Sequence, residues 1–340
     1  MQYSVIIPCY KSSKTIRGVV EDTMQEFEKM GRTPVEFILV DDCSPDGGAT
    51  VRALRSLVQD YRNVTAIELA ANSGQHNAQM AGLNHAKGDY IISMDDDGQT
   101  RASQLPYLFA ELEKGYDVVY AYYPQKEHSR GRNLGTWFNQ WSLRILMGKP
   151  KELKISSFWV IRRFVRDYAV RYRSPYTRMS GVFLRVTRNI SSVPVQHFKR
   201  EEGKSGYTLK KLIRLWQNIM AFSVVPLQIC AFVGDIVAAA GFLGILSVLI
   251  RRLLGIDTAL GWSSILVSIL FFSGLILMFL GLIGTYLGRI YLVMSDTPQF
   301  VVRQIDEQDA AGGSRFSARR ADAYETAAGG EEAAPEEVQD

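Results

Sequence analysis

The chain has 340 residues, enough for one large soluble domain with further segments attached. Its net charge of +4 is too small to indicate nucleic-acid binding, so no nucleic-acid partner is expected. Hydrophobic residues make up 47% of the chain, but they are concentrated in residues 226–294. We therefore predict a soluble domain over residues 1–220, a hydrophobic module over 226–294 and a disordered, polar tail over 305–340.

The first hundred residues alternate short apolar runs with segments of helical periodicity. The apolar runs are typical of strands buried on both faces, and this alternation predicts an α/β fold with a doubly wound, mostly parallel sheet. Ligands of such sheets bind beyond the carboxyl ends of the strands, where Tyr10, Asp42 and Asp95 fall. The predicted strands are 4–8, 37–40, 64–67 and 90–94, and the predicted helices are 15–30, 51–59 and 77–86.

Two long apolar runs form the hydrophobic module, at about 227–250 and 262–287. Each exceeds the roughly 20 residues that cross a bilayer as a helix, and the short connection between them predicts a transmembrane hairpin. Glycines along the second run would permit close helix contact. Basic residues before the first run place both ends of the hairpin in the cytosol, although Arg251 and Arg252 in the connection favour the reverse. These basic residues are Lys199, Arg200, Lys204, Lys210, Lys211 and Arg214.

Amphipathic segments at about 122–151 and 205–220 are predicted to lie as helices in the membrane interface. For the first of them, an ordinary helix packed on the core is the alternative. Asp235 is expected near the interface rather than inside the bilayer.

The three cysteines are far apart, form no Cys-x-x-Cys pair and suit a reduced, cytosolic chain. No signal-peptide pattern follows Met1.

Acidic residues follow the strand predicted at residues 90–94. Asp95 and Asp97, at alternate positions, can converge on one hard divalent cation, Mg²⁺ or Mn²⁺, with Gln99 close behind. Such a cation neutralises charge on a diphosphate leaving group. The alternative is a simple acidic turn.

A further carboxylate, Asp42, follows the strand predicted at residues 37–40. It could accept hydrogen bonds from a nucleobase or ribose, whereas nearby Ser44 or Asp46 could simply cap a helix. The segment from Asn72 to Gln75 precedes a predicted helix and could be a cap or a ligand loop.

Several motifs together resemble family 2 glycosyltransferases of the GT-A fold, in particular the branch that acts on polyprenyl phosphates. The resemblance covers about residues 3–303. The chain departs from the usual pattern at Lys11 (commonly Asn), at Ser12 (often acidic) and at Ser156-Ser157-Phe158-Trp159 (often Ser-Gly-Phe-Arg). The motifs are Val-Ile-Ile-Pro-Cys-Tyr (5–10), Val-Asp-Asp-Cys-Ser-Pro-Asp-Gly (40–47), Met-Asp-Asp-Asp-Gly-Gln (94–99), Arg-Glu-Glu-Gly-Lys-Ser-Gly-Tyr (200–207) and Gly-Thr-Tyr-Leu-Gly-Arg-Ile-Tyr (284–291).

The resemblance implies a role for each matching residue. Asp95, Asp97 and Gln99 would hold the metal and the diphosphate and form the catalytic group. The donor would be bound by these three together with Pro8, Tyr10, Val40, Asp42, Asp96 and Arg200. Candidates for the acceptor phosphate are Arg130, Arg132, Arg200, Lys204 and Ser205; contact of the first two and Lys204 with lipid headgroups is the alternative.

The predicted activity is an inverting, metal-dependent transfer of a sugar from a nucleotide diphosphate sugar to a polyprenyl phosphate. The branch resembled implies a uridine diphosphate donor, undecaprenyl phosphate as acceptor, a homotetramer, and a catalytic domain in the cytosol at the bacterial inner membrane. A phosphate acceptor is already anionic near neutral pH, because its second pKa is about 6, and so it needs no general base. The alternatives are a processive polysaccharide synthase, a catalytically silent nucleotide-sugar sensor and a transporter. A synthase would typically carry a Gln-x-x-Arg-Trp block, which residues 212–216 lack.

Overall fold

The computed structural model describes residues 2–98, 100–124, 150, 152–196, 262–295, 297–308 and 314–317, and some helical positions between 227 and 254. The chain divides into two compact units, which we describe separately. The first contains the predicted catalytic residues Asp95, Asp97 and Gln99 and is for that reason called here the catalytic domain; it comprises residues 1–127, 152–205 and 298–340. The second, the apolar unit, comprises residues 128–151 and 206–297.

A nine-stranded sheet forms the centre of the catalytic domain, in the order β7-β5-β6-β4-β1-β2-β3-β8-β9. Strands β4, β1, β2 and β3 are parallel neighbours, whereas β6 and β8 run antiparallel beside them. The expected doubly wound, mostly parallel sheet is therefore confirmed. The strands are β1 (Tyr3–Cys9), β2 (Val35–Asp41), β3 (Val64–Leu69), β4 (Tyr90–Ser93), β5 (Val118–Tyr122), β6 (Trp159–Arg162), β7 (Ile190–Pro194), β8 (Val302–Gln308) and β9 (Ser314–Ser317).

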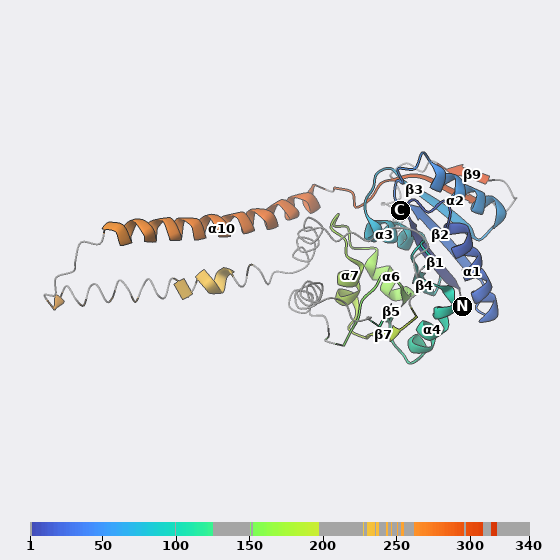
Figure 1. Ribbon diagram of the computed structural model, residues 1–340, viewed down its shortest axis with the longest axis horizontal. Coiled ribbons are helices and arrows are strands. Elements are labelled where there is room, and N and C mark those ends of the chain that lie inside the picture. The colour runs from blue at the N-terminus through green and yellow to red at the C-terminus, as the bar shows by residue number, and fades with distance from the viewer. Residues whose placement is uncertain are drawn as a thin grey trace, which may run out of the picture. The chain divides into compact units, whose positions relative to one another are not determined.

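Helices cover both faces of the sheet (Figure 1). On one face lie α1 (Ile16–Lys29), α2 (Ala49–Asp60) and α4 (Leu105–Glu113), preceded by a short 3₁₀ turn (Ala102–Gln104). On the other lie α3 (Gln75–His85), α6 (Arg163–Ala169) and α7 (Met179–Val186). Every helix and strand predicted within residues 1–94 overlaps an observed element, because alternating apolar strands and amphipathic helices have only this way to bury their apolar faces.

Successive residues of β1 point to opposite faces of the sheet. On the α1 face, the ring of Tyr3 packs 5.5 Å from that of Phe27 and 5.6 Å from that of Phe109. On the α3 face, Ile6 lies against Gly82, where an added Cβ would come within 2.4 Å of the Ile6 side chain. The close approach of α3 to β1 therefore requires glycine at position 82.

The predicted disordered tail is wrong over residues 305–308 and 314–317, which form most of β8 and all of β9. Strand β8 pairs antiparallel with β3, and Asp306 is buried beside Arg55, with Asp306 Oδ2 2.9 Å from Arg55 Nε. The sequence does not predict β8 as a strand because it has few large apolar side chains. Its polar side chains instead find partners on α2 and β3. The soluble domain therefore does not end at residue 220. Residues 309–313 and 318–340 lie outside the described part.

In the apolar unit, helix α10 (Trp262–Met294) contains the second predicted span and continues seven residues beyond it. Its segment Phe272–Met294 has a mean hydropathy of 1.8 and is long and apolar enough to cross a membrane; none of the side chains described in this segment is buried. Most residues of the first span, Asp235 and most of the two predicted interfacial helices lie outside the described part. The hairpin thus stays a prediction.

Candidate active site

Three segments that sequence reasoning singled out meet at one edge of the sheet. The parallel register sets Pro8 opposite Val40 and Cys9 opposite Asp41, and it sets Ile6 of β1 opposite Ser93 of β4. The side chains of Pro8 and Val40 are buried in the sheet, whereas Tyr10 is 48% exposed just beyond it. Among these predicted donor-binding residues, Tyr10 is thus the one whose side chain is open to a ligand.

Asp96 ties the end of β4 to the end of β1. Its Oδ2 accepts a 3.0 Å hydrogen bond from the Tyr10 N–H and another from the Ser12 hydroxyl. Burial raises the pKa of Asp96, against the effect of these two hydrogen bonds. The side chain predicted to bind donor therefore already holds the loop that carries Tyr10.

Asp95 is held from two other elements. The Gln75 side-chain amide at the start of α3 donates to Asp95 Oδ1 at 2.7 Å, and the Ser157 hydroxyl donates to Oδ2 at 2.5 Å. Burial raises the pKa of Asp95 to about 6; the negative charges of Asp97 and Asp96 add to the rise, and the two hydrogen bonds oppose it. Ser12 and Ser157, both departures from the family pattern, thus supply hydroxyl donors to this acidic cluster.

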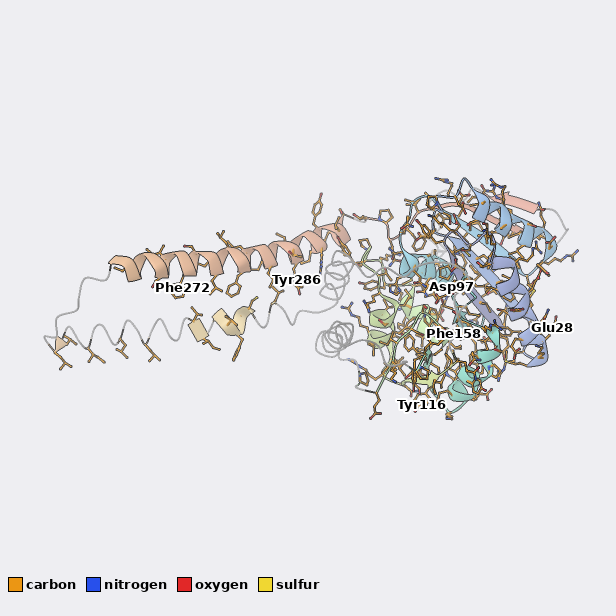
Figure 2. All side chains as sticks on the ribbon, in the orientation of Figure 1. Glu28, Asp97, Tyr116, Phe158, Phe272 and Tyr286 are labelled. Carbon is orange, nitrogen blue, oxygen red and sulfur yellow. The ribbon has the colours of Figure 1, made fainter. Side chains whose placement is uncertain are left out.

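Asp97 lies half-buried two positions further on, in the turn that follows β4. Figure 2 shows its side chain in the catalytic domain, above Phe158, the neighbour of Ser157. Gly98 follows with a φ of 70°, a conformation that favours glycine. The predicted ligand Gln99 lies outside the described residues, as do Arg130, Arg132, Arg200, Lys204 and Ser205.

Asp42 binds a loop of the protein itself. Its two carboxylate oxygens accept the backbone N–H groups of Ser73 at 2.7 Å and Gly74 at 2.9 Å, and the Asn72 side chain donates to its carbonyl at 3.1 Å. Burial raises the pKa of Asp42, while the two N–H donors lower it. The segment from Asn72 to Gln75 therefore belongs to the site, because it connects Asp42 to Asp95.

Asp46 serves the first turn of α2, as the helix-cap alternative expected, although the N-cap position itself is Gly48. Asp46 Oδ2 accepts the backbone N–H of Thr50 at 3.0 Å and the Thr50 hydroxyl at 2.6 Å, in the first turn of α2. Ser44 instead donates to Asp41 Oδ1 at 2.6 Å and accepts the Lys11 N–H at 2.9 Å. These hydrogen bonds hold the loops beside Asp42, and the Asp42 carboxylate takes no part in them.

Sequence reasoning missed a second polar group, made of His76, Tyr120 and Arg178. Burial, with a smaller contribution from the charge of Arg178, lowers the pKa of His76 to about 4. The Tyr120 hydroxyl is buried and has no hydrogen-bond partner in the described structure. Tyr120 lies opposite Trp159, which lies opposite Ser93, so this group is close to the end of β4. No motif or spacing marks these three residues, which only the fold brings together.

Several features of the acidic cluster fit a divalent cation. Carboxylate oxygens are the ligands that Mg²⁺ and Mn²⁺ prefer. Asp95 is crowded by two like charges, and no described Lys or Arg forms a salt bridge with Asp95 or Asp96. No group of three or more His, Cys, Asp or Glu side chains within the described residues is arranged to hold a metal. Asp95 and Asp97 would therefore need further oxygen ligands from Gln99 or from the substrate.

A family model described as "Glycosyl transferase family 2" matches residues 4–179, which include all the elements of this site. The chain belongs to glycosyl transferase family 2. The resemblance inferred from the motifs is thereby confirmed, and the protein is a glycosyltransferase.

Curated members of this glycosyltransferase family match almost the whole chain. The undecaprenyl-phosphate 4-deoxy-4-formamido-L-arabinose transferase of Edwardsiella ictaluri is 31% identical over 314 residues, covering 89% of this chain and 93% of that protein. The enzyme of the same name from Proteus mirabilis is 31% identical, with the same coverage. Among solved structures, glucosyl-3-phosphoglycerate synthase from Mycobacterium tuberculosis aligns at a TM-score of 0.48 and 16% identity, over 65% of this chain and 76% of that one.

Proposed function

We propose that this family 2 glycosyltransferase moves a sugar from a nucleotide diphosphate sugar to undecaprenyl phosphate. The observation that carries the proposal is the half-buried Asp95 carboxylate at the end of β4, next to Asp97 and held by Gln75 and Ser157. Two relatives support the acceptor: the transferases of Edwardsiella ictaluri and Proteus mirabilis are named for undecaprenyl phosphate and match this chain over 93% of their length.

The donor is proposed to be a uridine diphosphate sugar, bound across the ends of β1, β2 and β4. Tyr10 offers an exposed ring for the nucleobase or sugar, and Pro8 and Val40 shape the sheet edge beneath it. Asp42 acts mainly by holding the Asn72–Gln75 loop in place. Arg200 is proposed to contact a donor or acceptor phosphate.

Asp95 and Asp97, with Gln99, are proposed to hold Mg²⁺ or Mn²⁺. When bound, the cation would offset the negative charge of the departing nucleotide diphosphate. The residues of this chain contribute by fixing the carboxylates: Gln75 and Ser157 orient Asp95, and Asp96 fastens the Tyr10 loop beside it. Such orientation of a ligand by its neighbours strengthens both metal affinity and turnover.

The acceptor phosphate oxygen is proposed to attack the anomeric carbon as the bond from that carbon to the diphosphate oxygen breaks. In-line displacement inverts the anomeric configuration, and the anionic nucleophile has no proton to lose. The protein's task is then alignment and charge stabilisation. Arg130, Arg132, Arg200, Lys204 and Ser205 are the proposed acceptor-phosphate contacts.

We further propose that the enzyme is an integral membrane protein of the bacterial inner membrane, with its catalytic domain on the cytosolic side, and that it assembles as a homotetramer. Helix α10, with its glycines at 274, 281, 284 and 288, supports membrane insertion and close helix contact.

The direct test is a screen of radiolabelled nucleotide sugars against undecaprenyl phosphate with the purified, full-length protein. We expect label in a solvent-extractable lipid, dependent on Mg²⁺ or Mn²⁺, with inverted anomeric configuration. Label in a growing polysaccharide would support the processive synthase instead, and nucleotide-sugar binding without turnover would support the sensor.

A further inference from the structure

The chain re-enters the catalytic domain directly after α10, and this return segment, residues 298–301, lies close to the site. Helix α10 ends at Met294, and Gln299 and Phe300 are already buried in the catalytic domain. Strand β8 begins at Val302 and pairs with β3. The return segment is therefore built into the catalytic domain by hydrogen bonds and burial.

Gln299 contacts the loop that precedes α7. Its side-chain amide donates to the Ser174 carbonyl at 2.9 Å and also to the Thr177 hydroxyl. The carbonyl can only accept, so the Gln299 nitrogen must face this loop. The loop between Tyr172 and Arg178 is thus held by a residue that lies five positions after the end of α10.

The same loop is connected to the Asp42 site through Asn77. The Asn77 amide donates to the Pro175 carbonyl at 3.2 Å and to the Ser73 carbonyl at 2.9 Å. The Ser73 N–H, in turn, donates to Asp42. Hydrogen bonds thus run from Gln299 through this loop and Asn77 to the segment that binds Asp42.

The return segment also contacts the other end of the segment that binds Asp42. The Ala70 N–H, at the end of β3, donates to the Val301 carbonyl at 2.8 Å. Residues 71–74 therefore lie between two attachments: Ala70 is fixed by Val301, and Asn77 is fixed through the loop that Gln299 holds. Gln75, which donates to Asp95, lies within the same stretch.

We propose that Gln299 is a positioning residue for the donor site: with Val301 it clamps residues 70–77, and so sets the geometry of Asp42, Gln75 and Asp95. Gln299 touches neither aspartate itself. This inference rests on the proposed function only in taking Asp42 and Asp95, which residues 73–75 contact, to be part of the nucleotide-sugar site; the clamp is a statement about the fold and can be tested without substrate.

The sharpest variant is Gln299→Glu, which keeps the shape of the side chain but replaces the amide donor with a carboxylate facing the Ser174 carbonyl. The matched control is Gln308→Glu. Gln308, the last residue of β8, donates to the carbonyls of Val58 at 2.6 Å and Gln59 at 2.7 Å, at the end of α2. Both variants add one negative charge and lose amide donors to main-chain carbonyls.

Hydrogen exchange of the full-length protein tests the clamp directly. We expect Gln299→Glu to speed exchange of the Ser73 and Gly74 amides at least about tenfold, corresponding to a loss of about 1.4 kcal/mol, with no such change in Gln308→Glu. Equal exchange at these amides in Gln299→Glu and wild type, or equal increases in the two variants, would overturn the proposal.

Kinetics then separates positioning from general destabilisation. Gln299→Glu should raise the KM for nucleotide sugar more than it changes the KM for the lipid acceptor, and Gln299→Asn, which keeps a donor amide, should recover part of the loss. If the exchange result holds but no sugar reaches the lipid even with wild-type protein, the proposed function fails and the clamp stands. If wild type transfers sugar but Gln299→Glu leaves both the amide exchange rates and the KM unchanged, the clamp is wrong and the proposed function stands.

Discussion

Ser157 Oγ lies 2.5 Å from Asp95 Oδ2, although the two residues are 62 positions apart in the chain. The contact exists because β6 runs antiparallel beside β4, with Trp159 opposite Ser93. The residues just before β6 are therefore brought to the end of β4. A hydroxyl at this position orients one oxygen of the proposed metal ligand and opposes the rise in the pKa of Asp95.

Replacing Ser157 with alanine should weaken the metal site. Loss of one orienting hydrogen bond to a ligand typically costs about tenfold or more in metal affinity or activity. We expect Ser157→Ala to raise the Mn²⁺ concentration for half-maximal turnover by about tenfold. Ser156→Ala is the matched control, because the Ser156 hydroxyl donates to the carbonyl of Ala121 and not to the acidic cluster. An unchanged Mn²⁺ dependence in Ser157→Ala would contradict the role given to this hydroxyl.

Asp97→Asn should reduce turnover by at least about 10²-fold, the scale seen when one electrostatic contact to a developing charge is removed. Chelation of divalent cations should abolish the wild-type activity, and added Mg²⁺ or Mn²⁺ should restore it. Asp89→Asn, before β4 at the other end of the strand, makes the same change in charge away from the site. Full turnover of Asp97→Asn at saturating metal would show that Asp97 is not a ligand.

His76 should make the protein less stable in mild acid. Its folded-state pKa of about 4 lies below the ordinary value of 6.5, so the unfolded chain binds the proton more tightly. The contribution of neutral His76 to the free energy of unfolding is fully present above pH 6.5 and is lost as the pH falls from 6.5 towards 4. We expect the thermal midpoint of wild type to fall more steeply over this range than that of His76→Gln. Parallel pH profiles for the two proteins would contradict the depressed pKa.

The return of the chain to the sheet should be required for a stable catalytic domain. A chain ending after residue 297 loses β8, which exposes the edge of β3 and removes Asp306 from Arg55. We expect a lower thermal midpoint and aggregation. A chain ending after residue 317 keeps β8 and β9 and should match the full-length protein in both. Equal thermal midpoints for the two truncated chains would show that β8 is dispensable.

Local sequence patterns determined much of this protein. Buried strands and amphipathic helices have characteristic periods, so the elements up to residue 94 and the parallel sheet could be predicted. The positions of Tyr10, Asp42 and Asp95 followed, because parallel strands end at a common edge. The motifs at 5–10, 40–47 and 94–99 were enough to predict the family, since each is a continuous stretch of chain.

Only the tertiary structure decided which partner each polar side chain takes. Asp42 binds the N–H groups of Ser73 and Gly74, and Asp96 binds the Tyr10 loop, through contacts between segments that are far apart in the chain. Strand β8 could not be predicted from its own residues, because its polar side chains are stabilised by Arg55 and by the edge of β3. Local periodicity reports which face of an element is apolar, whereas hydrogen bonds between distant segments depend on how the whole chain packs.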